Sequence, residues 1–384
     1  MKMGSYRIMT GNEACARAAI ASGMRFFAGY PITPATEIAE LCSELLPKED
    51  GVYMQMEDEL ASIGAIIGAS ATGKKAMTAT SGPGFSLMQE NLGWAYINEI
   101  PLVIVDVMRK GPSGGSATLP AQADIMQTKW GTHGDYRSVV LASNSVEEIY
   151  TETIRAFNLA EKFRQPVILL YDAVLAHMSE KIYVPDEDEI EVIDRAKPAS
   201  KENYVPFRYE DSSVQPLGHF GEGYNIHMSG LTHDETGFPV SNQDTKGLEI
   251  LIHHLFDKID EHYDDEIKRY EAYMCDDADV LVVSIGITSR SAKSAVRQAR
   301  AMGIRAGLFR PITMWPFPHR DFSRINLHAK AIVTAEMNRG QLNQVAIEDI
   351  DRNQKLLMKN LYDGDQIRDV DILNSIIEAN KYEQ

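Results

Sequence analysis

Cysteine is scarce in this sequence, and its few occurrences stand far apart. Cys15, Cys42 and Cys275 form no Cys-x-x-Cys pair. Isolated thiols of this kind argue against a disulfide framework, and they are too few to hold a zinc ion or an iron–sulfur cluster within the chain. The histidines are scattered without the spacing of metal ligands, so we expect no metal site here.

The sequence also lacks any apolar run of about 18 residues, the length that a membrane-spanning helix requires. Its N-terminus has no apolar stretch behind the basic residue, which argues against a secretory signal. Basic residues are outnumbered, 38 against 55 acidic ones, and the formal net charge is −17. Nucleic acid binds best to a basic face, so this balance argues against such a partner. We therefore expect a cytoplasmic protein that binds neither a membrane nor nucleic acid.

The residues that are present describe alternating strands and helices. The chain has 384 residues, 44% of them hydrophobic, which is enough to bury the cores of two domains. From residue 25 to residue 171, short apolar runs rich in β-branched residues alternate with segments of helical periodicity, and the run 101–107 is the cleanest strand. Uninterrupted apolar strands between helices predict a doubly wound, parallel α/β sheet with helices on both faces.

The composition of the chain changes near residue 180. Residues 181–250 are rich in Asp, Glu, Pro, Gly and His and show little periodicity, which indicates a long connector over the surface. A charged helix from about 248 to 274 is expected to lead into a second α/β unit. We therefore divide the chain into a first domain (1–180), a connector (181–250) and a second domain (251–384).

Several segments that follow predicted strands carry side chains suited to a small anionic substrate. Because the carboxyl ends of parallel strands line the ligand crevice of an open α/β sheet, we expect these segments to meet. Thr33 supplies a hydroxyl, Arg109 a guanidinium, and Glu59 a carboxyl at the start of a very apolar helix. The segments are 29–34, 56–62, 80–85 and 108–115.

Each of these three side chains also has a purely structural alternative. Glu59 can interact with the dipole of its helix, and Thr33 can cap the helix that follows it. Arg109 can be a surface ion-pair residue. Against these alternatives, prolines on both sides of Thr33 fix its backbone. Arg109 directly follows a buried strand, and its guanidinium offers the two-pronged geometry that a carboxylate needs.

Motifs spread over nearly the whole chain together resemble one family. The sequence is similar to the α subunit of the thiamine-diphosphate-dependent 2-oxoacid:ferredoxin oxidoreductases, most closely to those of the 2-oxoglutarate type. Any one motif alone would be weak, but the combination is specific. The motifs are 11–14 (Gly-Asn-Glu-Ala), 30–34 (Tyr-Pro-Ile-Thr-Pro), 57–59 (Glu-Asp-Glu), 109–113 (Arg-Lys-Gly-Pro-Ser), 231–237 (Leu-Thr-His-Asp-Glu-Thr-Gly), 310–318 (Arg-Pro-Ile-Thr-Met-Trp-Pro-Phe-Pro) and 336–342 (Glu-Met-Asn-Arg-Gly-Gln-Leu).

The resemblance implies a role for each domain and for the cofactor. The first domain is expected to bind the aminopyrimidine half of thiamine diphosphate, and the second to be like a transketolase C-terminal domain. Glu59 would contact the ring nitrogen N1′ and act as the catalytic carboxyl, with Glu57 as the alternative. Phe85 would stack on the aminopyrimidine, and a core phenylalanine is the alternative.

The resemblance also implies the reaction and the substrate contacts. Thr33, Arg109 and Thr118 would contact a 2-oxo acid, the arginine through the substrate's carboxylate. The implied reaction is oxidative decarboxylation of the 2-oxo acid with coenzyme A, which yields an acyl-CoA, CO₂ and reduced ferredoxin, or the reverse. The first candidate substrate is 2-oxoglutarate, with pyruvate or a branched-chain 2-oxo acid as alternatives.

The chain lacks parts that such a reaction needs, and the resemblance implies that a partner supplies them. No Gly-Asp-Gly followed downstream by an asparagine is present to bind Mg²⁺ and the diphosphate, and no cysteine cluster is present. A separate β subunit would carry both sites, with a 4Fe–4S cluster that reduces ferredoxin, in an (αβ)₂ assembly. A non-catalytic scaffold homologue is the alternative. A nicotinamide dehydrogenase is disfavoured, because no Gly-x-Gly-x-x-Gly follows the first strand.

Overall fold

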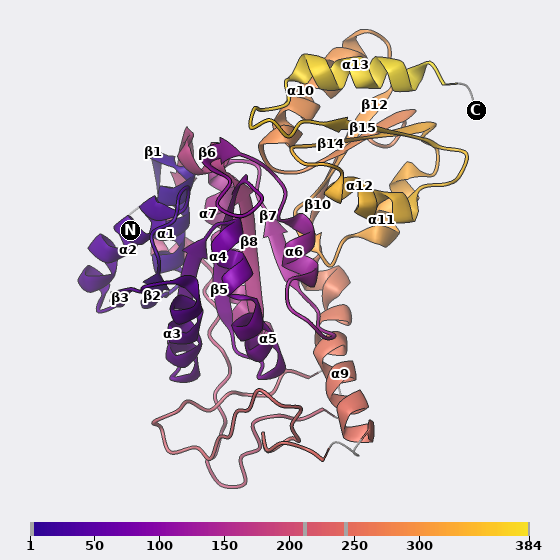
Figure 1. Ribbon diagram of the computed structural model, residues 1–384. Coiled ribbons are helices and arrows are strands. Elements are labelled where there is room, and N and C mark those ends of the chain that lie inside the picture. The colour runs from indigo at the N-terminus through magenta and orange to yellow at the C-terminus, as the bar shows by residue number, and fades with distance from the viewer. Residues whose placement is uncertain (1–3, 210–212, 242–244, 383–384) are drawn as a thin grey trace.

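The computed structural model describes residues 4–209, 213–241 and 245–382, and its largest sheet has eight strands (Figure 1). These strands are β2 (Phe26–Gly29), β3 (Val52–Gln55), β4 (Ala76–Thr80), β5 (Leu102–Lys110), β6 (Ser116–Pro120), β7 (Val139–Ala142), β8 (Pro166–Asp172) and β13 (Thr313–Trp315). Their order is β13-β7-β8-β5-β4-β2-β3, with β6 paired to β5 beside this path. All neighbours are parallel except β6 and β13, which pair antiparallel.

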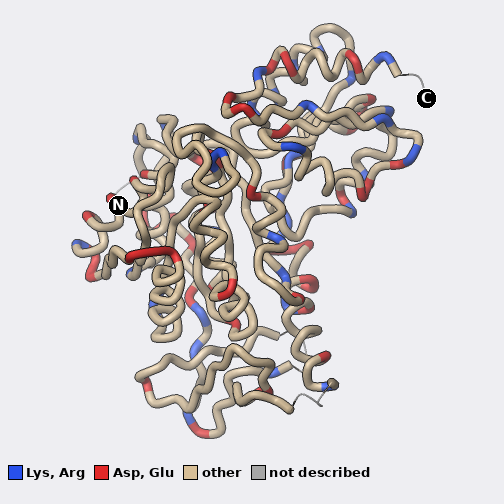
Figure 2. Tube along the Cα trace, viewed as in Figure 1, with Lys and Arg blue, Asp and Glu red and all other residues tan. Residues whose placement is uncertain are grey.

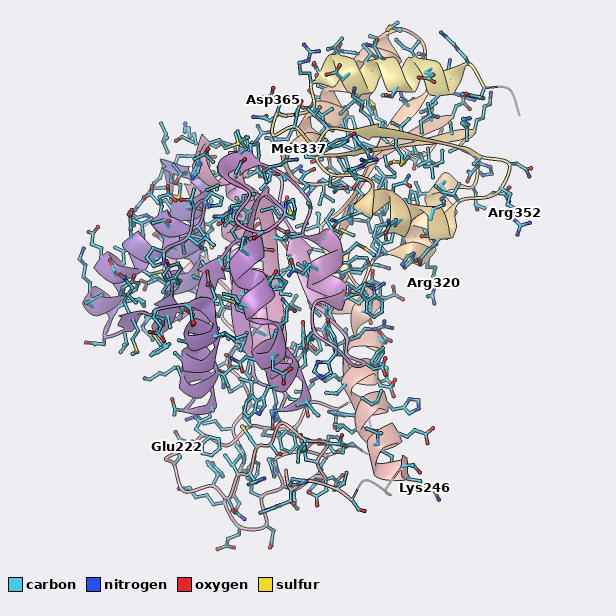
Figure 3. The ribbon with its side chains drawn as sticks, viewed as in Figure 1. Glu222, Lys246, Arg320, Met337, Arg352 and Asp365 are labelled. Atoms are coloured by element: carbon cyan, nitrogen blue, oxygen red, sulfur yellow. The ribbon has the colours of Figure 1, made fainter. Side chains whose placement is uncertain are left out.

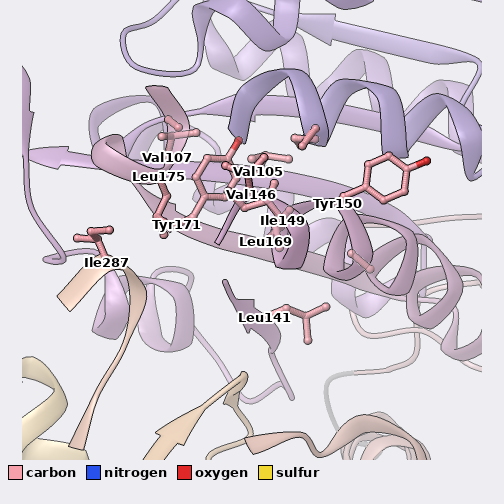
Figure 4. Packing of buried hydrophobic residues seen from close by; sticks show 14 of the residues in the cluster. Val105, Val107, Leu141, Val146, Ile149, Tyr150, Leu169, Tyr171, Leu175 and Ile287 are labelled. Carbon is pink, nitrogen blue, oxygen red and sulfur yellow. The ribbon is translucent and has the colours of Figure 1, made fainter. Parts of the chain in front are cut away.

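Helices cover both faces of this sheet. Val105 and Val107 of β5 pack on the face of α1 and α7, and Figure 4 shows this core from close by. Ile104 of the same strand packs on the opposite face, with α3 and α5. Because both faces are buried, β5 is apolar without alternation from Leu102 to Met108, except at Asp106. The predicted doubly wound α/β fold is confirmed. The helices of this domain are α1 (Gly11–Ala21), α2 (Thr36–Leu45), α3 (Glu59–Ala71), α4 (Gly82–Leu87), α5 (Gln89–Ile97), α6 (Ile125–Trp130), α7 (Val146–Phe163) and α8 (Ala173–His177).

The second domain is built on a five-stranded sheet of order β10-β12-β11-β14-β15. Its strands are parallel except for the edge strand β10. In Figure 1, α10 and α13 lie on one face of this sheet and α11 and α12 on the other. The elements are β10 (Tyr270–Tyr273), β11 (Val280–Ser284), α10 (Gly286–Ala301), β12 (Ala306–Pro311), α11 (His319–Asn326), β14 (Ala331–Glu336), α12 (Gln341–Ala346), β15 (Lys355–Asn360) and α13 (Asp369–Asn380).

The chain crosses from the second domain back to the first at β13. After β12 ends at Pro311, residues Thr313–Trp315 pair antiparallel with β7 at the edge of the first sheet. The chain then returns to α11 in the second domain. The motif 310–318 therefore joins the two sheets, and its tryptophan, Trp315, donates its indole N–H to the Ile125 carbonyl at 2.9 Å.

The connector lies beneath the helices of the first domain, below α3 and α5 in Figure 1. Its described residues between 185 and 241 contain a 3-10 turn at 187–189 and one isolated bridge, and no α-helix or strand. Arg164, which is buried, donates to the carbonyls of Pro206 at 2.9 Å and Gln215 at 3.0 Å. The connector is thus fixed to the end of α7.

One predicted helix is shorter than expected. The charged helix predicted over 248–274 is α9, Thr245–Asp260, and a π-helical turn (Tyr263–Ile267) and β10 follow it. Tyr270 and Tyr273 begin and end an edge strand paired with β12, so tertiary pairing of tyrosine-rich residues overrides the local helical pattern. Between β4 and β5 the chain likewise forms two short helices, α4 and α5, which are separated at Met88.

The three cysteines are buried and free. Burial raises the pKa of the Cys15 thiol to about 11, so it stays protonated at neutral pH. In the part of the chain that the structure describes, none of the helices has the length and apolarity that crossing a bilayer requires.

Candidate active site

Thr33 and Arg109 meet at the carboxyl end of the first sheet. Arg109 donates from Nη1 to the Thr33 carbonyl at 2.5 Å and from Nη2 to the Gly114 carbonyl at 3.1 Å. The Nε of Arg109 is buried and has no hydrogen-bond partner among the described residues. The guanidinium forms no salt bridge with a described residue. The guanidinium is therefore fixed by neutral carbonyls and is available to an incoming anion.

Glu59 is the first residue of α3 and is almost completely buried, with 4% of its surface exposed. The preceding residue, Asp58, caps the helix, because its Oδ1 accepts the Ala61 N–H at 2.7 Å. Burial raises the pKa of Glu59, while Arg109 and a hydrogen bond with Thr80 act in the opposite direction. A buried carboxyl with a raised pKa suits a group that exchanges a proton with a ligand.

The two candidate carboxyls differ in burial. Glu57 is exposed, whereas Glu59 is buried and faces Thr80 on the neighbouring strand β4. Geometry therefore favours Glu59 as the carboxyl that can meet a ligand away from water.

Gly84 in α4 makes room for the Glu59 carboxyl. A β-carbon at this position would lie 2.2 Å from Glu59 Oε1 and 2.2 Å from Thr80 Oγ1, so any other residue would displace one or both side chains. The backbone of α4 consequently packs directly against the carboxyl. This explains why a glycine follows the proline in the segment 80–85, a role that sequence reasoning did not assign.

Thr33 does not cap the helix that follows it. α2 begins at Thr36 with Ala35 in the N-cap position, so the capping alternative for Thr33 is wrong. The turn is fixed instead by Asn12, whose Nδ2 donates to the Pro34 carbonyl at 2.7 Å. Asn12 belongs to the motif 11–14 and has a positioning role that the sequence did not reveal.

The glycine-rich segment after Arg109 is part of a hairpin, and the prediction that Arg109 directly follows the buried strand is wrong, because the residue lies within the strand. β5 continues through Arg109 to Lys110 and pairs antiparallel with β6. Arg109 lies opposite Pro120 and Lys110 opposite Ser116, with an irregular register between them. Thr118 lies on β6 in this irregular stretch and is exposed. The hairpin thus brings Thr118 close to Arg109 along the backbone.

Phe85 is fully buried in α4. It belongs to the same core cluster as Ile63, Met88 and Leu92, between α4, α3 and α5. This position matches the packing alternative. A stacking role toward an aminopyrimidine stays a prediction, and it requires a ring face that the isolated chain does not expose.

A cleft of about 620 Å³ lies beside Arg109, between the two domains. The second domain contributes residues of the motif 336–342, and Figure 3 labels Met337 where the domains meet. Asn338 Nδ2 donates to the Gln122 carbonyl at 2.5 Å, and Gln341 Nε2 donates to the Ala123 carbonyl at 2.5 Å. The motif therefore joins the second domain to the wall of the cleft.

Two carboxyls near Arg109 escaped the sequence analysis. Asp106 lies within β5, fully buried, and neither of its oxygens has a hydrogen-bond partner among the described residues. Burial and the neighbouring Asp124 raise its pKa well above the ordinary value. Burial raises the pKa of Asp124 to about 6, although Arg109 lowers it. Asp106 could have been noticed in the sequence, because it is an aspartate inside the apolar run 101–107. Nothing in the sequence pointed to Asp124 as its neighbour.

Comparison with models of protein families identifies the family of this chain. Residues 17–250 match the family model described as "Pyruvate flavodoxin/ferredoxin oxidoreductase, thiamine diP-bdg", and residues 278–372 match "Pyruvate:ferredoxin oxidoreductase core domain II". The chain belongs to the thiamine-diphosphate-dependent 2-oxoacid:ferredoxin oxidoreductases. The predicted family, and the oxidoreductase class that goes with it, are confirmed.

Relatives within this family are close. The chain is 50% identical over 334 residues to 2-oxoglutarate synthase subunit KorA of Methanocaldococcus jannaschii, covering 87% of this chain and 89% of the relative. It is 48% identical over 333 residues to the KorA subunit of Methanothermobacter marburgensis, covering 86% and 88%. Members of the family with this name are subunits, so the chain is similar to one part of an oxidoreductase complex.

Solved structures agree with the fold. The chain superposes with a TM-score of 0.92 and 34% identity on 2-oxoglutarate:ferredoxin oxidoreductase from Magnetococcus marinus, whose structure holds 2-oxoglutarate, coenzyme A and succinyl-CoA. The match covers 98% of this chain and 65% of that one, so the family's longer chain contains a part that this chain does not span. A split-gene transketolase at 13% identity and a TM-score of 0.57 shares the fold alone.

Proposed function

We propose that this chain is the α subunit of an enzyme that converts 2-oxoglutarate and coenzyme A to succinyl-CoA, CO₂ and reduced ferredoxin, or catalyses the reverse. The observation that carries the proposal is the Arg109 guanidinium, held by the Thr33 carbonyl beside the buried Glu59 and without a salt bridge among the described residues. The names of the relatives and the ligands of the Magnetococcus enzyme support the choice of substrate.

The residues around Glu59 fit the aminopyrimidine half of thiamine diphosphate. The carboxyl is buried, its pKa is raised, and the absence of a β-carbon at Gly84 lets a backbone segment approach it closely. When bound, this cofactor supplies a nucleophilic carbon and an electron sink for decarboxylation. Glu59 would hold a proton opposite the ring nitrogen, and the dry surroundings strengthen that hydrogen bond.

Arg109, Thr33 and Thr118 would bind and orient the 2-oxo acid. The guanidinium would hold the 1-carboxylate through charge-assisted hydrogen bonds, which are shorter and stronger than neutral ones. Because the two Nη groups are already fixed by backbone carbonyls, the guanidinium loses little freedom when the substrate arrives. Thr118 would reach the same substrate from β6.

The remaining parts of the enzyme would come from a β subunit. It would bind Mg²⁺ and the diphosphate, hold a 4Fe–4S cluster and reduce ferredoxin, in an (αβ)₂ complex in the cytoplasm. Among the described residues, no group of three or more His, Cys, Asp or Glu side chains is arranged to hold a metal ion. We also retain the division of the chain at residues 180 and 250, with the first domain for the cofactor and the connector beneath it.

The proposal is tested by Glu59→Gln in the complex with the β subunit. The amide keeps the shape of the side chain but does not exchange a proton, so we expect assembly and cofactor affinity to persist. Turnover should fall by roughly 10²–10⁴-fold, the usual contribution of a positioned acid or base. Glu57→Gln is the matched control, because that glutamate is exposed and two residues away. Loss of turnover in Glu57→Gln but not in Glu59→Gln would overturn the assignment.

A further inference from the structure

Asp106 and Asp124 are two neighbouring carboxyls near Arg109, the first fully buried and the second half-buried at the cleft. Asp106 lies three residues before Arg109 on β5 and opposite Thr80 in the parallel pairing with β4. It is 0% exposed, and both carboxyl oxygens lack a hydrogen-bond partner among the described residues. An ionised carboxylate in such surroundings is very costly, so Asp106 holds a proton.

Asp124 faces the cleft that Arg109 lines. It stands in the N-cap position of α6, yet its side chain makes no capping hydrogen bond, and its Oδ2 is buried without a partner among the described residues. A β-carbon on Gly82 would lie 3.0 Å from Asp124 Oδ1, so the carboxylate packs against the backbone of that glycine. The side chain is therefore turned away from its own helix and toward the site.

The charged groups around Asp124 come from several elements. β5 contributes Asp106 and Arg109, and its last residue, Lys110, donates to the Tyr362 carbonyl. The second domain contributes Arg339, which lies 5.1 Å from the centre of the Tyr362 ring. From α3, Glu59 is close enough to Arg109 for the arginine to lower its pKa. Of these groups, Arg109 is the cation that acts on Asp124, and it lowers the pKa of that carboxyl.

We propose that Asp106 and Asp124 together carry one negative charge that balances Arg109 in the absence of a ligand, and that Asp124 takes up a proton from solvent when a carboxylate ligand occupies Arg109. The inference rests on the proposed function, because it assigns Arg109 to the substrate's carboxylate. Both aspartates are positioning residues, since they act on the ligand through the guanidinium. The charge is balanced: the carboxylate of the ligand supplies the negative charge near Arg109, and one proton moves from solvent to an Asp124 oxygen.

The direction of the pH dependence follows from this exchange. In the free protein the pKa of Asp124 is raised to about 6, so Asp124 is ionised at neutral pH. A bound carboxylate disfavours that ionised form and raises the pKa further. Binding is therefore strongest at or below the free pKa and weakens as the pH rises through the neutral range, by up to about tenfold per pH unit.

The test measures proton uptake on the complex with the β subunit, thiamine diphosphate and Mg²⁺. The probe is 2-hydroxyglutarate, which carries the same carboxylates but lacks the 2-oxo group. Calorimetric titration at about pH 7.5 in phosphate and in Tris, whose ionisation enthalpies differ, gives the number of protons bound with the probe. We expect uptake of about one proton per site in the wild type, and its loss in Asp124→Asn. Asp124→Asn should also bind the probe more tightly at about pH 8, because a negative charge in the same cleft is gone.

Three further variants distinguish a failure of this inference from a failure of the proposed function. Asp106→Asn should keep the uptake, because Asp106 already holds its proton, and Glu59→Gln should keep it as well. Uptake that survives in Asp124→Asn, or that disappears in Glu59→Gln, would overturn the inference and leave the proposed function intact. Arg109→Ala should weaken binding of the probe about tenfold or more. If the probe binds Arg109→Ala normally, the proposed substrate site itself is wrong, whatever the aspartates do.

Discussion

Glu99 and Asp106 lie seven positions apart, one just before β5 and one within it, and both carboxyls are buried in opposite electrostatic settings. The Glu99 carboxylate accepts a hydrogen bond from Lys258 Nζ at 2.9 Å and lies 3.2 Å from His254 Nε2. Burial acts to raise its pKa, but the positive charges around it, that of Lys258 above all, hold the pKa well below the ordinary value. Asp106 has no hydrogen-bond partner among the described residues, and its pKa is well above the ordinary value. The first carboxyl is charged and paired, and the second is neutral and unpaired.

The two carboxyls therefore have different roles. Glu99 lies at the end of the sheet where an ion pair stabilises the fold, and Asp106 lies closer to the end where we propose that the substrate binds. Glu99 joins the first domain to α9, so its ion pair fixes the helix that leads from the connector to the second domain. Asp106 lies in the middle of β5, three residues before Arg109, which lines the cleft together with Asp124. Figure 2 shows acidic and basic residues interspersed along the chain, so overall charge does not distinguish the two ends. The two carboxyls themselves differ: Glu99 is charged and paired, whereas Asp106 is unpaired close to residues that line the cleft.

The largest expected effect is on the free energy of unfolding, when the buried ion pair between Glu99 and Lys258 is removed. Glu99→Gln leaves the Lys258 ammonium buried without its counter-charge, and we expect the free energy of unfolding to fall by about 3–5 kcal/mol. Urea unfolding of the purified complex at about pH 7 measures the change. Glu90→Gln is the control, because Glu90 lies on α5 with 78% of its side chain exposed.

The same variant should change the pH dependence of stability. Since the pKa of Glu99 is lowered in the folded state, its contribution is complete above the ordinary pKa of glutamate. It is lost as the pH falls through the lowered folded-state value. The wild type should therefore lose stability in acid more steeply than Glu99→Gln. Parallel curves for the two proteins would show that the ion pair contributes nothing.

An intermediate effect is expected at the binding end. Arg109→Ala should raise the KM for 2-oxoglutarate about tenfold or more, since a charge-assisted hydrogen bond contributes about 1.5–3 kcal/mol. Arg109→Lys should recover part of the loss, because a point charge replaces a fork. Steady-state kinetics of the complex measure both. Arg339→Ala, which removes another cation of the same cleft, should change KM by less than about twofold. Equal effects at both arginines would mean that the cleft acts through its net charge alone.

The smallest effect is expected at Asp106, and it has the opposite sign to that of Glu99. The carboxyl must bind a proton when the chain folds at neutral pH, because its pKa is raised in the folded state. Asp106→Asn removes this cost but buries an amide without partners, so the net gain in the free energy of unfolding at neutral pH should be small, about 1 kcal/mol. The gain should be lost as the pH falls toward the ordinary pKa of aspartate, where both states carry the proton. A gain that is constant with pH would contradict the protonation argument.

Much of the fold could be predicted because local apolar runs and helical periodicity determine most of its strands and helices. The apolar runs that became β4, β5 and β8 had no competing helical period, and Glu59 stood at the start of an apolar helix. The end of α9 could not be predicted, since Tyr270 becomes a strand residue only by pairing with β12. Asp124 was hidden for a similar reason: its partner in space is Asp106, and only the packing of α6 against the end of the sheet brings the two together.

The crossing of β13 has a consequence for the modularity of the chain. The two family matches end at residue 250 and begin at residue 278, which suggests a protein that can be divided between them. The first sheet, however, takes its edge strand, Thr313–Trp315, from the far side of any such division. A fragment ending near residue 260 would leave β7 as an open edge, prone to pair with other chains. The two halves of this enzyme are therefore expected to be inherited, expressed and engineered as one unit.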